Sequence, residues 1–196
     1  MKQGIAILAG CLMAASSQAA LFNFTGDIEY HNDVVQIGFS LEEDATDVRV
    51  WTDSFLSGAN FDPITALWTG DGMLIDENDD NDGVNPGTQS RFDSGFTLSS
   101  LAAGDYIFTV ATYDNFVVGD TLDEGFAFDG QVPVTLADWD QPANGTGKGS
   151  YWSVWLDGVD DASNPDDPTA SVPEPASVAL LGLGLLGLGV RRLRRG

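Results

Sequence analysis

The chain has 196 residues, and 30 acidic residues against 8 basic ones give it a net charge of −22. This charge excludes nucleic acid as a natural partner, because a nucleic-acid-binding protein neutralises phosphates with basic residues. Cys11 is the single cysteine, so no disulfide can form within the chain. The length suits one domain of about 150 residues with short segments at its ends.

Residues 1–19 have the three parts of a secretory signal peptide. Lys2 precedes an apolar run at residues 5–15, and Ser17 and Ala19 supply the small side chains that signal peptidase requires before its cleavage site. We therefore expect an exported chain that begins at Ala20. The alternative, a lipoprotein box "LAGC" that would acylate Cys11, is disfavoured because its apolar run is shorter than the usual 7 to 15 residues or so.

The sequence of the body, residues 20–163, predicts short strands separated by Gly, Asp, Asn and Pro. Alternating or β-branched and aromatic side chains mark the expected strands, and no segment shows a helical stripe. The expected strands are residues 22–28, 35–41, 48–51, 64–68, 92–98, 106–113, 126–128 and 151–156. About eight such strands predict an all-β fold, an antiparallel β-sandwich.

The most distinctive candidate for a functional site in the body is the acidic segment "DENDDNDG" at residues 76–83. Asn78, Asp80 and Asp82 fall at alternate positions before Gly83, a spacing that lets a tight loop aim oxygen atoms at one hard cation such as Ca²⁺. The segment is no EF-hand, because Gln89 stands at the twelfth position of the loop, where an EF-hand has glutamate. A solvated acidic turn is the alternative.

Two further aspartates are expected to complete such a calcium site. Asp62 and Asp114 stand at the ends of predicted strands, from which they can reach the acidic loop. Residues 20–171 contain 29 acidic residues and only Arg49, Arg91 and Lys148, a net charge of −26. A bound divalent cation would relieve the resulting repulsion.

His31 is the only histidine, which excludes zinc sites built from two or three histidines. Its neighbours Asn32 and Asp33 predict an exposed turn. Trp152 and Trp155 lie three positions apart in a predicted strand, so they point to opposite faces of a sheet. One of the two is a candidate platform for stacking on a sugar ring, and packing in the core or at its rim is the alternative.

Five short motifs occur in an order and spacing that resemble the bacterial pre-peptidase C-terminal domain. They are FTG at 24–26, FDP at 61–63, NDD at 78–80, LAAGDY at 101–106 and YDN at 113–115. The resemblance covers about residues 22–126 and leaves residues 131–161 unexplained. It implies a jelly-roll-like, calcium-associated sandwich that acts as an accessory module, usually without catalysis of its own.

The C-terminal part has a linker and a marginal membrane span. Residues 164–175 contain four prolines and predict a stiff, extended linker, while residues 176–190 carry no charge. Residues 176–196 are therefore predicted as a transmembrane helix. Its arginines would hold that end on the cytoplasmic side. These arginines are Arg191, Arg192, Arg194 and Arg195.

The linker ends in Val172, Pro173, Glu174 and Pro175, followed by the apolar span and the arginines. This order resembles the PEP-CTERM sorting signal of Gram-negative bacteria that make extracellular polysaccharide. The resemblance implies that an exosortase, a membrane protease, recognises the Pro-Glu-Pro region, cuts near it and releases the protein outward. An ordinary C-terminal anchor is the alternative.

Together these patterns predict an exported surface or matrix protein without enzymatic activity. Its expected partners are signal peptidase, the inner membrane before processing, exosortase and extracellular polysaccharide, and its expected cofactor is Ca²⁺. The predicted role is structural or adhesive, with a carbohydrate-binding module as the alternative and a secreted hydrolase as a further one.

Overall fold

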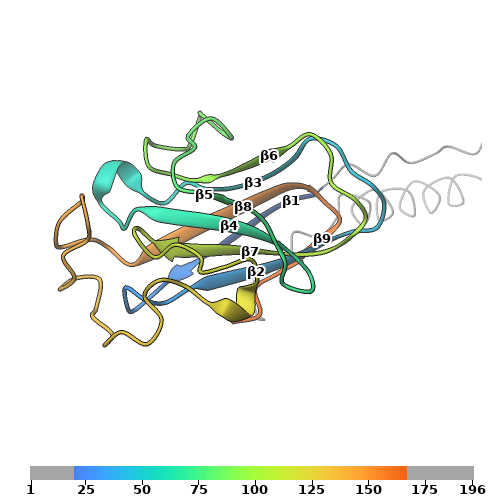
Figure 1. The fold of residues 1–196 in the computed structure, drawn as a ribbon. Coiled ribbons are helices and arrows are strands. Elements are labelled where there is room, and N and C mark those ends of the chain that lie inside the picture. The colour runs from blue at the N-terminus through green and yellow to red at the C-terminus, as the bar shows by residue number, and fades with distance from the viewer. Residues whose placement is uncertain (1–19, 167–196) are drawn as a thin grey trace, which may run out of the picture.

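The computed structural model describes residues 20–166, which form two antiparallel sheets packed face to face (Figure 1). One sheet has four strands in the order β1 (Ala20–Asp27), β8 (Tyr151–Val159), β3 (Val48–Thr52) and β6 (Gly95–Leu98). The other has five, in the order β5 (Leu74–Asn78), β4 (Pro63–Thr69), β7 (Gly104–Thr112), β2 (Val35–Leu41) and β9 (Asp161–Ser163). The described helical segments are two 3₁₀ turns, Leu56–Gly58 and Leu122–Glu124.

The main core lies between the two sheets. In β2 every second residue is buried, as expected for a strand with one face toward a core and the other toward solvent. Ile37 of β2 and Phe108 of β7 meet Val154 and Leu156 of β8 in one apolar cluster, and all four side chains are fully buried. This burial drives the association of the two sheets.

A second, smaller core lies on the outer face of the five-stranded sheet. Ala66, Trp68 and Ala111 point outward from β4 and β7, and Phe126 covers them from a loop, its ring 6.3 Å from the ring of Trp68. The expected strand at 126–128 is therefore wrong. Phe126 forms only an isolated bridge with Val117, because its side chain serves as a cover for the sheet.

The all-β sandwich predicted from the sequence is confirmed, and most strands lie where they were expected. Residues 92–94 are not part of β6, and β5 and β9 were not predicted. Within residues 20–166 no helix is long and apolar enough to cross a membrane. The predicted signal peptide and transmembrane helix, and all of the linker after residue 166, lie outside the described residues.

Candidate metal centre

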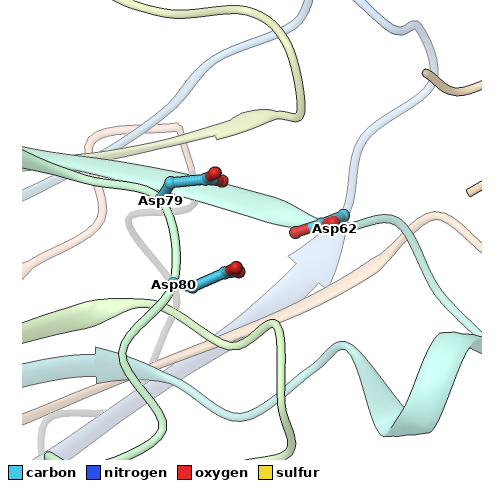
Figure 2. A group of neighbouring side chains, drawn as sticks. All are labelled: Asp62, Asp79 and Asp80. Carbon is cyan, nitrogen blue, oxygen red and sulfur yellow. The ribbon is translucent and has the colours of Figure 1, made fainter. Parts of the chain in front are cut away.

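Three carboxylates converge at one end of the sandwich, where β4 begins and β5 ends. Asp62 precedes β4, and Asp79 and Asp80 follow β5. The two strands are antiparallel neighbours with Thr65 opposite Asn78, so the start of one lies beside the end of the other. One oxygen of each carboxylate lies within 4.8 Å of the others, and Figure 2 shows the three groups pointing toward one another.

Asp62 is the most enclosed of the three, with 3% of its surface exposed. Its Oδ2 accepts a hydrogen bond from Nδ2 of Asn144 at 2.6 Å, while its Oδ1 is buried and has no partner among the described residues. Burial, which penalises the charged form, raises the pKa of Asp62 to about 7, and the nearby Asp80 carboxylate adds to this effect. The hydrogen bond from Asn144 is therefore the only hydrogen bond among the described residues that favours the ionised form of Asp62.

Asp79 and Asp80 extend this site toward solvent. Asp79 is half-buried, its Oδ1 is buried without a partner among the described residues, and burial raises its pKa to about 6. The pKa of the exposed Asp80 is also raised, by partial burial, and the nearby Arg91 opposes that shift. Three carboxylates that repel one another and carry raised pKa values form a site that a cation would stabilise.

The donor set indicates which cations fit. All three groups offer carboxylate oxygen, which hard cations such as Ca²⁺ prefer over the nitrogen and sulfur donors that favour zinc. Oδ1 of Asp62 and Oδ1 of Asp79 are buried and have no partner among the described residues, so an ion bound by these two carboxylates would compensate them. The residues present therefore fit a calcium ion, with further positions left for backbone oxygen or water.

The structure brings together only part of the predicted ligand set. Asp62 and Asp80 belong to the cluster, and Asp79, which sequence reasoning missed, completes it. Asp82 and Asp114 lie outside the group of three and are exposed. Asp114 is still near enough for its charge to raise the pKa of Asp79.

Asn78 is held by the protein itself. It is the last residue of β5, and its Oδ1 accepts a hydrogen bond from Oγ of Ser94 at 2.9 Å. The prediction of alternate ligands assumed that residues 76–83 form one loop. The strand instead continues through Asn78, so the consecutive Asp79 and Asp80 are the residues that turn toward Asp62. Because β5 pairs with β4, the strand-end position of Asp62 was the informative signal.

The two tryptophans of β8 lie on opposite faces of the sheet, as predicted. Trp152 is 4% exposed and packs in the main core, so it offers no surface for a sugar. Trp155 is half-buried on the outer face, where its ring stacks beside Trp51 with centroids 6.1 Å apart. Its Nε1–H donates to Oδ2 of Asp53 at 2.9 Å, so Trp155 alone remains a candidate platform.

The expectation that His31 is exposed is wrong, because only 3% of its surface is accessible. Its ring packs against both Phe128 and Trp139, with each ring centroid 5.3 Å away. Nδ1 accepts a hydrogen bond from the Val134 N–H at 3.2 Å, and Nε2 lies 3.3 Å from Oε1 of Gln131. The histidine thus fastens the loop of residues 126–139 to the sandwich and is unavailable as a catalytic base.

Comparison with known proteins identifies the C-terminal signal. Residues 171–195 match the family model of the PEP-CTERM protein-sorting motif, a stretch that includes Val172, Pro173, Glu174 and Pro175. Proteins with this motif are exported and sorted by exosortase, so exosortase is a partner of this chain. No curated protein matches the chain, and the resemblance of residues 22–126 to the pre-peptidase C-terminal domain stays a prediction.

Proposed function

We propose that this exosortase-sorted protein is a non-catalytic, calcium-binding β-sandwich with a structural or adhesive role in extracellular polysaccharide. The sorting motif at residues 171–195 supports the route to the outside. The cluster of Asp62, Asp79 and Asp80 supports the cation. A jelly-roll-like, calcium-associated accessory domain is also what the resemblance of the body implies.

The buried Oδ1 of Asp62 is the observation that carries the calcium proposal. A carboxylate with 3% of its surface exposed and one oxygen without a partner is costly to ionise. A proton or a cation removes that cost. Because two more carboxylates lie within 4.8 Å, a divalent cation also removes their mutual repulsion, which a single proton does not.

Calcium is favoured over magnesium by the construction of the site. The carboxylates come from two separate chain segments, and a hydrogen bond to Asn144 fixes only one of their oxygens. Ca²⁺ tolerates irregular geometry and six to eight oxygens, whereas Mg²⁺ demands a near-octahedral shell and keeps its waters.

The experiment is a thermal melt of the secreted, processed protein with calcium or magnesium at equal ionic strength. If Ca²⁺ binds only the folded state, a hundredfold excess over Kd stabilises it by about 2.7 kcal/mol, which raises Tm by several degrees. The Asp62→Asn variant should lose this response. Equal shifts with both ions, unchanged in Asp62→Asn, would show general screening instead of a site.

The matched control for this experiment is Asp82→Asn. It removes the same charge from the same acidic segment, but Asp82 is exposed and lies outside the group of three. It should keep the calcium response of the wild type.

The processing step has its own test. We expect signal peptidase to cleave before Ala20 and exosortase to cleave near Pro173, Glu174 and Pro175. Until the second cleavage, the C-terminal segment would anchor the chain in the inner membrane. Glu174→Ala should leave an uncut, membrane-held form that retains Arg191 and the other terminal arginines. Intact-mass measurement that finds Leu193 on wild-type protein from the medium would contradict this route.

A carbohydrate-binding module remains the second candidate, and Trp155 is the observation that favours it. Its indole is half-buried on the outer face of the four-stranded sheet and is oriented by Asp53. Binding to a glycan array that Trp155→Ala abolishes would favour this role over a purely structural one. A secreted hydrolase is the weaker alternative, since both ring nitrogens of His31 are engaged in the loop that it fastens.

A further inference from the structure

The free edge of β1 differs from the other three sheet edges within residues 20–166. The edge of β6 is four residues long, and Nδ2 of Asn81 donates to the carbonyl of Gly95 there at 3.0 Å. The β9 edge has three residues and includes Asp161. The β5 edge carries Asp76 and Glu77 and meets the segment around Asp120, whose carbonyl accepts from the Leu74 N–H at 2.9 Å.

β1 is eight residues long and pairs with β8 on one side only. No strand or bridge in the described part of the chain pairs with its other side (Figure 1). An edge of this length offers a row of unpaired N–H and C=O groups, which natural proteins usually protect with charge, proline, bulges or a covering loop. Over residues 20–26, "ALFNFTG", β1 has neither charge nor proline, and its pairing with β8 is regular from Phe22 to Asp27 after one register shift between Ala20 and Phe22.

This absence of charge is notable because residues 20–171 carry a net charge of −26. Contact between two copies through the β5 edge would oppose like charges at Asp76 and Glu77. Contact through β1 would bring no two charged side chains opposite each other over the seven positions 20–26. The only long strand edge in the described chain that two copies can share without direct charge repulsion is therefore that of β1.

We propose that two processed chains pair through β1 in antiparallel orientation, joining their four-stranded sheets into one continuous sheet. A two-fold axis through Asn23 places Leu21 of one copy opposite Thr25 of the other, and residue 20 opposite residue 26. Such a contact is isologous and closes after two copies, so it forms a dimer without further growth.

The two ends of the strand are complementary in charge in this arrangement. After cleavage before Ala20, the new α-amino group is a cation at the start of β1, and the exposed Asp27 stands at its end. Antiparallel pairing brings each ammonium beside the Asp27 carboxylate of the other copy. The pairing therefore rests on removal of residues 1–19, independently of any bound cation.

Sedimentation of the secreted protein tests the pairing. Strand-edge contact buries little surface, so we expect a weak dimer at protein concentrations on the order of 100 µM. The dimer should strengthen as salt rises, because screening weakens the repulsion between two acidic bodies. The double variant Leu21→Lys, Thr25→Lys should remain monomeric, since Lys at a strand edge opposes pairing.

The double variant Val118→Lys, Val132→Lys is the matched control. Both valines are exposed, at 46% and 82%, and lie outside β1, so this variant has the same charge change and should dimerise like the wild type. A wild type that stays monomeric at every concentration and salt, or dimers that persist with both β1 lysines, would overturn the proposal.

A cysteine at position 23 tests the register without relying on the lysine variants. The processed chain has no cysteine, because Cys11 is removed with residues 1–19. Opposed residues of antiparallel strands have Cα atoms about 4.5 to 5.5 Å apart, a distance that a disulfide spans. Asn23→Cys should yield a disulfide dimer under mild oxidation and Val132→Cys should not. Failure at position 23 under conditions where the wild type dimerises overturns the antiparallel pairing.

Discussion

Two buried carboxylates at the same end of the sandwich differ in how the protein satisfies them. Asp93 is fully buried, and its oxygens accept four hydrogen bonds: from the Phe55 and Ser90 N–H groups at 3.0 and 2.7 Å, and from the Ser90 and Thr52 hydroxyls at 2.9 and 3.3 Å. Asp62, with 3% of its surface exposed, accepts one hydrogen bond, from Asn144. Asp93 is thus satisfied within the fold, whereas Oδ1 of Asp62 has no partner among the described residues.

This difference distinguishes a carboxylate that the fold satisfies from one that we propose as a calcium ligand. Burial raises the pKa of both groups, but the hydrogen bonds to Asp93 oppose the shift from several directions. At Asp62 the neighbouring carboxylates of Asp80 and Asp79 add to it. The same substitution at the two positions should consequently have opposite effects on the cation-free protein.

The largest expected effect is that of Asp93→Asn. An amide in place of the carboxylate presents a donor to groups that are themselves donors, so buried N–H and O–H groups lose their acceptor. We expect the free energy of unfolding to fall by about 2 to 4 kcal/mol. Urea unfolding at pH 7 in a chelator measures this. A loss below about 0.5 kcal/mol would mean that the four hydrogen bonds do not stabilise the fold.

The next effect is the calcium response itself, about 2.7 kcal/mol at a hundredfold excess over Kd in the wild type. Asp93→Asn should retain it, because Asp93 lies outside the group of three. Asp62→Asn should abolish it, because the cluster loses one of its three carboxylates. Urea unfolding with and without calcium separates the two variants. A response that disappears equally in both would contradict the distinction between the two carboxylates.

A smaller effect concerns pH in the absence of divalent cations. The pKa of Asp62 in the folded state is raised to about 7 from an unfolded value near 3.8, so the folded state binds the proton more tightly. Its contribution to stability is complete below pH 4 and is lost as pH rises toward and through 7. The free energy of unfolding of Asp62→Asn should equal that of the wild type near pH 4 and exceed it by about 2 kcal/mol at pH 8. The difference stays this small because the loops relax around the ionised Asp62 of the wild type.

Chelator-treated protein across this pH range provides the measurement for both chains. The acidic surface outside the group of three contributes nearly equally to each chain, so the difference between them reports Asp62 together with its repulsion from Asp79 and Asp80. If the wild type were as stable as Asp62→Asn at pH 8, Asp62 would be adequately solvated and the case for a cation would fail.

Sequence reasoning predicted the strands that the core dictates. β2 was found because its apolar side chains alternate with small or polar ones, and β7 because it is rich in β-branched and aromatic residues. Ile37 and Phe108 from these strands lie in the same core. β5 was missed because its residues "LIDEN" contain two acidic side chains and do not alternate between apolar and polar. Its place in the sheet comes from pairing with β4. Pairing with a buried neighbour outweighed the low strand propensity of Asp76 and Glu77.

The candidate site was half predictable for the same reason. Asp62 was selected because it stands just before a recognisable strand segment, and that position depends on β4 alone. Asp79 was not selected, because its orientation depends on where β5 ends, which the acidic pattern conceals. His31 was wrongly predicted to be exposed because the rings that cover it belong to Phe128 and Trp139. These residues lie in a loop, and the packing of a loop cannot be predicted from a periodic sequence pattern.

The smallest expected effect is that of Asp82→Asn, and it decides how the comparison is interpreted. Asp82 is exposed and influences the cluster only through its charge, which raises the pKa of Asp80. Its substitution should change the stability of the cation-free protein by less than about 0.5 kcal/mol. Calcium affinity should fall slightly at low salt, because one nearby negative charge is lost, and this difference should vanish at about 0.5 M salt as screening becomes complete.

Asp62→Asn should behave differently under the same conditions. It removes a proposed ligand, so its calcium affinity should stay below that of the wild type at low and at high salt. Isothermal titration of the wild type and both variants at low and high salt makes the comparison. If Asp82→Asn weakened calcium binding as much as Asp62→Asn at both salt concentrations, the ion would be held by the acidic segment as a whole. In that case the buried oxygen of Asp62 would play no part in binding.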